Sequence, residues 1–446
     1  MKLYRVIIIF ALVVMCGLGW MIYVNDTVTT DKAYRQYVEK GDDRFKEGLY
    51  ELAIESYRAA DGLKPSEAAC ERIINAYEQW YKNEPEHSVR KGLEKAYNDA
   101  ISRYPKNISF WEGYARECIN NSNYSEVVSL FNKAGVQHIS SDNLTALYKD
   151  AFYAVKLTNS AYEYITLGTQ NSIYTYGDGA EQYGTLKGNG SEGIIYGKFN
   201  YISPAGAGGI VIAKDENGEC FGIDLSGKKV ARFMADIVEC RGPGGQLLAA
   251  RLEGRDDWCF IDYNGEEQFG GYLNAGSFAG GKAPVQLSNG SWTFIDEEGN
   301  QNETLYEDVL VDESGNFLMN NCVFVKDSGK WILKNLNEKD VDVFTCDEID
   351  ISRGEAIAFC DNGKWGFVRP SGEVIIQPAY ENARSFSGGV AAVCVNGMWG
   401  FVDTKGEMVI EPEYANAGYF DKTGGTCPVI DREKDLWQLL IWRVSR

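Results

Sequence analysis

The spacing of apolar residues divides the chain into three parts. Residues 6–24 are apolar almost without interruption, whereas residues 31–158 carry apolar side chains at the three- and four-residue spacing of one helix face. From residue 160 to residue 446, apolar and polar positions alternate with a period of two, and Gly and Asn punctuate the alternation. The sequence therefore predicts a multidomain α + β protein with a transmembrane helix, a helical segment and a large all-β domain.

The first part has the length of a membrane span. Residues 6–24 are 19 residues without a charge, and a helix of this length crosses a hydrocarbon core of about 30 Å. Trp20 and Tyr23 stand where aromatic residues gather at a membrane surface. We expect an uncleaved single-pass anchor embedded in the lipid bilayer.

The flanking charges give this anchor an orientation. Lys2 and Arg5 precede the apolar run, and positive charge favours the cytoplasmic side. Residues 1–5 are thus predicted to be a cytoplasmic tail, with the bulk of the chain outside the cytoplasm. A cleaved signal peptide would have a shorter apolar core and an Ala-x-Ala-like site, and a lipoprotein signal would have small residues before Cys16, where Val and Met stand.

The beginning of the second part has the pattern of a paired-helix repeat. Small residues let two antiparallel helices approach, a tyrosine fills the space between them, and a glycine and a proline mark the turn and the helix end. This spacing resembles the tetratricopeptide repeat. The residues that carry the resemblance are Gly48, Tyr50, Ala53, Tyr57, Ala60 and Pro65.

Two more copies follow, and residues 141–158 are predicted to form a capping helix. The resemblance implies a stack that binds a peptide in a concave groove, while a rigid spacer that holds the next domain off the membrane is the other interpretation. The copies are carried by Leu93, Tyr97, Ala100 and Pro105, and by Trp111, Tyr114, Phe131 and Ala134.

One eight-residue unit recurs through the third part: an aromatic residue, a small residue, two apolar residues, Asp, two variable residues and Gly. Successive copies lie 34–39 residues apart, and two of them have glycine after the tryptophan, at Gly366 and Gly400. The Trp-Gly pair resembles the WG-repeat family, and the resemblance covers about the last 280 residues. The copies begin at Tyr183, Cys220, Trp258, Trp292, Trp331, Trp365, Trp399 and Trp437.

The repeat predicts both an architecture and structural roles. Asn396-Gly397 marks a hairpin, and three or four strands per unit fit a blade of a seven- or eight-bladed β-propeller, with a β-solenoid of stacked hairpins as the alternative. We expect the tryptophans to pack between neighbouring units. The Asp of the unit is predicted to accept hydrogen bonds from the backbone of the turn that follows. These residues are Asp224, Asp262, Asp296 and Asp403.

Candidate chemistry is sparse. The net charge of −20 argues against nucleic-acid binding. The chain has only two histidines and no Gly-x-Ser-x-Gly motif, which excludes most catalytic triads and zinc sites that depend on histidine. Residues 188–193 fit Gly-x-Gly-x-x-Gly, but a strand pattern follows where a dinucleotide site requires a helix. We therefore predict no catalytic residue, cofactor or metal, and the cysteine spacings predict no particular disulfide pairing.

These observations favour a membrane-anchored, non-catalytic binding or scaffold protein of the cell envelope that acts through protein–protein interaction. The resemblance to WG repeats further implies a bacterial source. The alternative is an extracytoplasmic sensor or binder of cell-wall carbohydrate or a small ligand, since the β repeats are rich in acidic and aromatic residues. A hydrolase with a pair of carboxylates is the less favoured third hypothesis.

Overall fold

A computed structural model describes residues 27–169, 172–178, 182–206, 209–319, 322–336, 340–351 and 353–444. The predicted tail 1–5, the predicted anchor 6–24 and Cys16 lie outside these ranges. Among the described residues, none of the helices combines the length and apolar character that a membrane span requires. The chain divides after Phe152 into a helical unit and a β unit.

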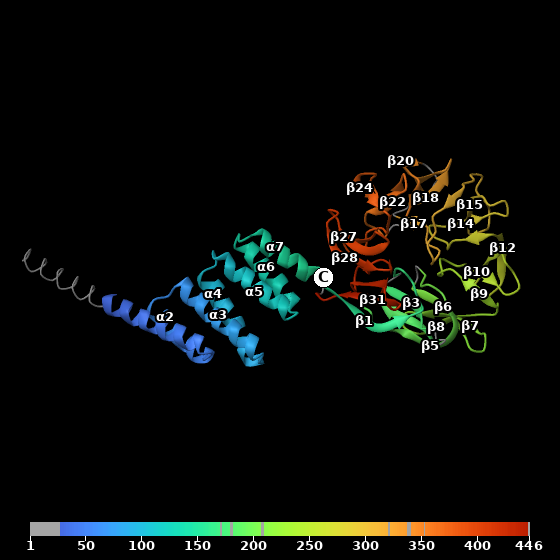
Figure 1. The fold of residues 1–446 in the computed structure, drawn as a ribbon. Coiled ribbons are helices and arrows are strands. Elements are labelled where there is room, and N and C mark those ends of the chain that lie inside the picture. Colours follow the sequence, from blue (N-terminus) through green and yellow to red (C-terminus); the bar gives the residue numbers. More distant parts are fainter. Residues whose placement is uncertain are drawn as a thin grey trace, which may run out of the picture. The chain divides into compact units, whose positions relative to one another are not determined.

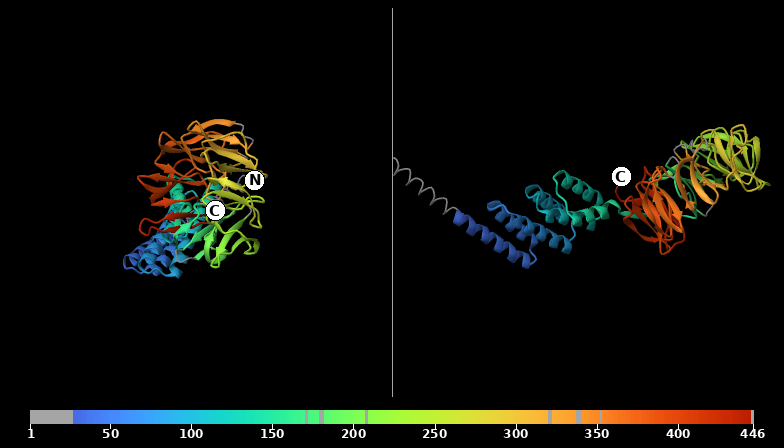
Figure 2. Two further views of the ribbon diagram at one scale, coloured as in Figure 1. Left: turned by 90° about the vertical axis from the view of Figure 1, so that its right-hand side faces the viewer. Right: turned by 90° about the horizontal axis from the view of Figure 1, so that it is seen from above.

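The helical unit is a row of antiparallel helices, each packed on the next (Figures 1 and 2). Gly48 turns the chain in the left-handed region at φ 78°, and Ser66 begins a helix by accepting a hydrogen bond from the N–H of Ala69 at 3.2 Å. Residues 27–46 are helical, and the helices that follow are α2 (Tyr50–Leu63), α3 (Glu67–Asn83), α4 (His87–Arg103), α5 (Ile108–Asn120), α6 (Tyr124–Val136) and α7 (Asp142–Phe152).

A tyrosine packed against a glycine recurs along this row. A Cβ on Gly41 would lie 2.4 Å from the ring of Tyr57, so only glycine lets the tyrosine lie flat between the two helices. The same relationship joins Gly92 to Tyr77 and Gly113 to Tyr97. Of the residues that suggested the repeat, Ala53, Tyr57, Ala60, Tyr97, Ala100 and Trp111 are buried, Tyr50 and Phe131 are half-buried, and Pro65 is exposed after α2.

The structure corrects the predicted capping helix, which was expected to continue to residue 158. α7 ends at Phe152, and strand β1 (Val155–Tyr162) begins three residues later. β1 pairs antiparallel with β31 (Trp437–Trp442), with Val155 opposite Trp442. The branched Val155 and the apolar Leu157 suit a strand, and a neighbour almost 300 residues away in sequence decides the conformation.

The β unit is an eight-bladed β-propeller, which confirms the predicted architecture over the solenoid (Figure 1). β5 (Glu192–Ile202) serves two blades, since its first half pairs with β4 and its second half with β6. Blade 1 contains β2 (Tyr164–Ile165), β3 (Ile173–Gly177), β4 (Gln182–Lys187) and β5; blade 2 contains β5, β6 (Ile210–Asp215), β7 (Cys220–Asp224) and β8 (Lys229–Phe233). Blade 3 contains β9 (Ile237–Cys240), β10 (Leu248–Leu252), β11 (Trp258–Ile261) and β12 (Glu267–Tyr272); blade 4 contains β13 (Asn274–Ala275), β14 (Lys282–Gln286) and β15 (Trp292–Asp296).

The second half of the ring follows the same order, from an inner to an outer strand. β1 forms the outer strand of blade 8, so the first and last strands of the β unit close the ring together. Blade 5 contains β16 (Asp308–Val309), β17 (Leu318–Met319), β18 (Cys322–Asp327), β19 (Lys330–Asn335) and β20 (Asp340–Cys346); blade 6 contains β21 (Glu348–Ile349), β22 (Ile357–Asp361), β23 (Lys364–Val368) and β24 (Val374–Tyr380). Blade 7 contains β25 (Asn382–Ala383), β26 (Val390–Val395), β27 (Met398–Asp403) and β28 (Met408–Tyr414); blade 8 contains β29 (Asn416–Ala417), β30 (Thr426–Ile430), β31 and β1.

The eight-residue unit of the sequence forms the third strand of every blade. Its apolar face packs against the next blade: the cluster around Trp399 and Phe401 also contains Phe420 and Val429 of blade 8. In four blades a phenylalanine of the third strand meets one in the following blade, as with Phe401 and Phe420 at 5.1 Å between ring centres. Equivalent pairs are Phe260–Phe278, Phe294–Phe317 and Phe367–Phe386.

Candidate functional site

The predicted repeat residues lie in the walls of the propeller. Trp258, Trp292, Trp331 and Trp399 are buried, while Trp365 and Trp437 are half-buried. The carboxylate of Asp403 accepts hydrogen bonds from the N–H groups of Lys405 at 2.9 Å and Glu407 at 3.0 Å. Asp224, Asp262 and Asp296 bind their turns in the same way.

The glycine of the Trp-Gly pair is required because the backbone of the outer strand passes close to it. A Cβ on Gly400 would lie 2.6 Å from the carbonyl oxygen of Ile410, and one on Gly366 would lie 2.5 Å from that of Ile376. Both contacts come from an irregularity in the outer strand, where the pairing register shifts. Pro412 lies in the shifted segment, where a missing N–H costs no ladder bond.

The cysteines that follow the predicted anchor are also part of the packing. All ten are free thiols; nine are buried and Cys322 is half-buried. Burial raises the pKa of the Cys360 and Cys394 thiols above the usual value. In the described ranges there is no group of three His, Cys, Asp or Glu side chains placed to hold a metal.

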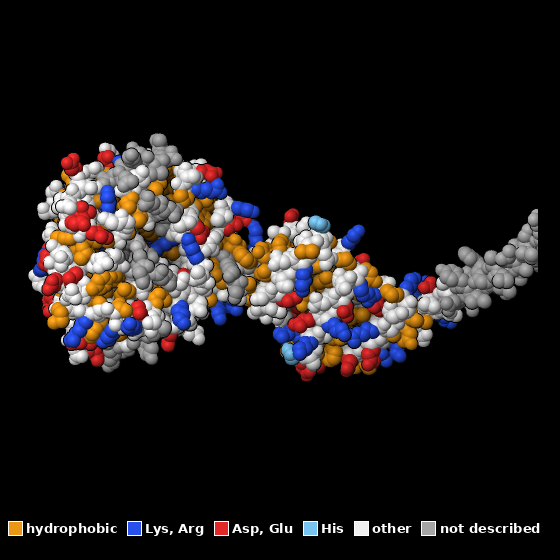
Figure 3. Space-filling model, turned by 180° about the vertical axis from the view of Figure 1, so that it is seen from behind, with side chains coloured by type: hydrophobic (Ala, Val, Ile, Leu, Met, Phe, Trp, Pro, Cys, Tyr) orange, Lys and Arg blue, Asp and Glu red, His pale blue; other side chains and the backbone are white. Residues whose placement is uncertain are grey.

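A pocket of about 450 Å³ lies inside the ring, on the side where the inner strand of each blade turns back to its second strand. Blades 1 and 5 stand on opposite sides of the ring, and both supply lining residues, so the pocket occupies the central channel. Figure 3 shows the propeller hollowed at its centre. The lining includes Thr169 of blade 1, Asp312 and Leu318 of blade 5, Arg353 of blade 6 and Tyr419 of blade 8.

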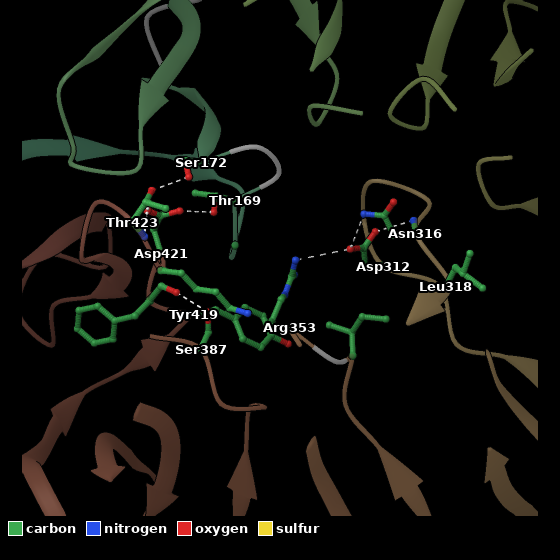
Figure 4. A pocket seen from close by; sticks show the side chains of 14 residues that line it. Thr169, Ser172, Asp312, Asn316, Leu318, Arg353, Ser387, Tyr419, Asp421 and Thr423 are labelled. Carbon is green, nitrogen blue, oxygen red and sulfur yellow. Dashed lines mark hydrogen bonds and ion pairs between the residues drawn. The ribbon is translucent and has the colours of Figure 1, made fainter. Parts of the chain in front are cut away.

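Arg353 extends across this pocket between Tyr419 and Asp312 (Figure 4). Its guanidinium carbon lies 4.4 Å from the centre of the Tyr419 ring, and Nη1 lies 3.7 Å from Oδ2 of Asp312. The Arg353 side chain is only 12% exposed, and its buried Nε has no hydrogen-bond partner among the described residues. Burial acts to lower the pKa of Arg353, but the surrounding Tyr419 and acidic groups raise it overall, so the side chain is charged.

A second acid near the pocket, Glu313, has a shifted pKa. Burial, followed by the negative charge of Asp312, raises the pKa of Glu313 to about 7. One oxygen of Glu313 accepts a hydrogen bond from the N–H of Leu167 at 3.0 Å. Its carboxyl therefore changes protonation near neutral pH.

Two arginines that the sequence analysis missed join neighbouring blades. Nε of Arg241 donates to the carbonyl of Ala275 at 3.1 Å and Nη2 to Asn274 at 2.9 Å. Arg384 makes the same pair of contacts with Ala417 and Asn416. Both arginines stand directly after the inner strand of their blade, and this shared position was the feature of the sequence that could have identified them.

None of the predicted repeat positions lines the central pocket. The residues that do line it differ from blade to blade, so the repeat pattern gave no signal for them. The one feature of the sequence that points to this pocket is Arg353, because basic residues are few between an inner strand and the second strand of a blade.

The helical unit has a smaller hollow of its own, about 320 Å³, beside α2, α3 and α4. Tyr77 and Trp80 stack there at 6.3 Å between ring centres, and Arg58 donates to the Tyr77 hydroxyl at 3.0 Å. An aromatic wall with a basic side chain is a surface that a peptide can use.

Comparison with known proteins supports the repeat and adds two distant structural similarities. The family model described as "WG containing repeat" matches residues 365–399 and 399–430, which confirms the resemblance in that region. No curated protein sequence matches the chain significantly. The structure is similar to that of BamB from Moraxella catarrhalis, with 9% identity, a TM-score of 0.41, and coverage of 65% of this chain and 100% of that one. It is also similar to the computationally designed Ika8 protein, with 10% identity, a TM-score of 0.41, and coverage of 65% and 98%.

Proposed function

We propose that the chain is a non-catalytic binding protein of the cell envelope, held at a membrane by residues 6–24, that acts through protein–protein interaction. The supporting observation is a set of large apolar side chains exposed where successive blades join. Burying such side chains against a partner is favourable. They are Met234 at 81% exposure, Leu273 at 52%, Leu305 at 51% and Val238 at 43%.

Val238 and Leu273 occupy equivalent positions of blades 3 and 4, two residues before the end of the inner strand. In blades 5, 6 and 7 the equivalent residue is an acid that binds the hairpin turn of its own blade. Glu381, for example, accepts a hydrogen bond from the N–H of Gly397 at 2.8 Å. Glu307 and Asp347 do the same with Gly329 and Asn362. The apolar residues in blades 3 and 4 therefore replace a structural contact with an exposed surface.

Site-specific photo-crosslinking in cells tests this proposal. A photoreactive amino acid at position 273 or 238 of the full chain is expected to capture one discrete protein. Position 415 is the matched control, because Ala415 is exposed at the equivalent place in blade 8. Equal capture from positions 273 and 415, or none from either, would contradict an interface on blades 3 and 4.

The central pocket favours a second candidate function, the binding of cell-wall carbohydrate or a small ligand outside the cytoplasm. A charged and nearly buried Arg353 beside an open volume of about 450 Å³ is the observation behind it. For wall polymers, the test is pelleting of the protein with insoluble wall material at low salt. Complete recovery of the protein in the supernatant would remove the wall polymer as the ligand.

A further inference from the structure

The guanidinium of Arg353 is short of hydrogen-bond acceptors. A guanidinium carries five N–H donors in one plane, but the nearest carboxylate oxygen, Oδ2 of Asp312, lies 3.7 Å from Nη1, beyond hydrogen-bond distance. The Tyr419 ring covers one face of the group and accepts no N–H bond in its plane. A buried donor without an acceptor is unfavourable, so this side chain is placed at a cost to the free protein.

The acids around Arg353 are already engaged with their own surroundings. Oδ1 of Asp312 accepts hydrogen bonds from the N–H groups of Ser314 and Asn316, each at 2.9 Å. The two oxygens of Asp350 accept from the Tyr419 hydroxyl at 2.7 Å and the N–H of Ser385 at 2.6 Å. These bonds occupy Oδ1 of Asp312 and both oxygens of Asp350, while Oδ2 of Asp312 forms a long ion pair with the guanidinium at 3.7 Å.

Asp421, on the opposite wall, is engaged in the same manner. It accepts hydrogen bonds from the Thr169 hydroxyl at 2.6 Å and the N–H of Thr423 at 3.0 Å (Figure 4). Asp421 is buried, and these bonds lower its pKa against the opposing effect of burial, so it is ionised. The pocket thus pairs one undersatisfied cation with acids whose oxygens are taken.

The free volume beside the guanidinium has the size of a small-molecule site. Its about 450 Å³ are bounded by apolar groups at Leu318 and Ile351 and by hydroxyls at Ser172 and Thr423. An apolar patch with a few polar groups suits a ligand with a compact body and one strongly recognised group.

We propose that the central pocket binds a small ligand through a single carboxylate held by the guanidinium of Arg353. This inference rests on the second candidate function and gives it a ligand chemistry. A carboxylate matches the planar fork with two parallel N–H···O bonds, and it replaces the acceptors that the free protein lacks.

The charges of the pocket favour a monoanion over a phosphate. Asp312 and Asp421 are acidic neighbours, and a dianion would meet more repulsion from them than a carboxylate does. Among the described residues of the lining, Lys422 is the second cation; it lies at the rim with its Nζ 3.9 Å from Glu355 and offers no second buried charge. A carboxylate brings only one negative charge to Arg353, which limits the repulsion from these acids.

Binding to the full-length protein in detergent tests the proposal, with carboxylates compared against neutral molecules of the same shape. The pairs are acetate and acetamide, benzoate and benzamide, and D-glucuronate and D-glucose, with inorganic phosphate as the dianion. We expect saturable binding of at least one carboxylate by calorimetry, and a smaller or absent signal for its neutral partner and for phosphate. The Arg353→Gln variant should bind the carboxylate roughly 10–100-fold more weakly than the parent, which corresponds to the loss of charged hydrogen bonds. The affinity of Arg353→Lys should lie between those of the parent and Arg353→Gln.

Two further variants separate binding from folding. Leu318→Trp fills the pocket and leaves Arg353 in place, so it should abolish carboxylate binding even if Arg353→Gln does not fold. Arg369→Gln is the matched control, because it removes an exposed arginine that does not line the pocket, and it should bind like the parent.

Preference for the neutral partner or for phosphate, the absence of binding by every carboxylate, or full binding by Leu318→Trp would each overturn the proposal. Crosslinking from position 273 is independent of these results, so the protein interface and the carboxylate site fail separately.

Discussion

The guanidinium carbon of Arg241 lies 4.6 Å from the centre of the Trp258 ring, while its nitrogens bind the inner strand of the next blade. Arg384 repeats this arrangement over Trp399 at 5.3 Å. In both blades the tryptophan supports an arginine that fastens its own blade to the following one. The tryptophan of the repeat is therefore part of the joint between blades as well as part of their core.

Arg241→Lys tests the joint. Lysine keeps the charge but loses the planar fork that reaches Ala275 and Asn274 together, so we expect the free energy of unfolding of the propeller to fall by roughly 1–3 kcal/mol. Urea denaturation followed by tryptophan fluorescence measures the change. Arg369→Lys is the control: Arg369 is 57% exposed in a pair with Glu373, and its replacement should change the stability by less than about 0.5 kcal/mol.

Trp399→Ala tests the tryptophan itself. The side chain is only 8% exposed and packs between blades 7 and 8, so its removal should destabilise the propeller by roughly 3–5 kcal/mol. Trp365→Ala should cost less, because Trp365 is half-buried. A Trp399→Ala protein with the parent's melting temperature would show that the tryptophan serves another purpose, such as binding.

Gly400→Ala tests the Trp-Gly pair. The added methyl group would lie 2.6 Å from the carbonyl oxygen of Ile410, and moving the strand away should cost roughly 1–3 kcal/mol. In contrast, Gly62→Ala in α2 meets no atom within 4 Å and should stabilise the helical unit by roughly 0.5–1 kcal/mol. Similar effects of the two substitutions on their respective units would contradict the close approach at Gly400.

Glu313 predicts a pH dependence of stability. Its pKa in the folded protein is raised from 4.5 to about 7, so the folded state binds more protons than the unfolded state between these values. Its contribution to stability is fully present below the unfolded pKa and is lost as the pH rises through about 7. Relative to Glu313→Gln, the free energy of unfolding of the parent should fall by up to roughly 3 kcal/mol between pH 4.5 and pH 8. Parallel stability curves for the two proteins would refute the raised pKa.

The sequence by itself determined the features that depend on neighbours along the chain. The third strand of each blade, the hairpin at Asn396-Gly397 and the turn bound by Asp403 all follow from residues within a few positions of one another. The same holds for the helices, whose apolar faces are periodic. Repeats of 34–39 residues over about the last 280 residues also limited the predicted number of blades to seven or eight.

The tertiary structure decided what depends on ring closure. Residues 155–158 follow the last helix and look helical in sequence, but they form the outer strand of blade 8 because β31 presents an unpaired edge there. The number of blades is likewise a property of the packing between them, which no single unit contains.

The candidate site also depends on ring closure. Thr169, Asp312, Arg353 and Tyr419 come from four blades and meet only because the ring returns to its start. A sequence repeat reports positions that every blade needs for packing, whereas the channel side chains are free to differ once packing is satisfied. Arg353 is thus an ordinary basic residue in the sequence, and burial opposite Asp312 and Tyr419 makes it the undersatisfied charge at the centre of the fold.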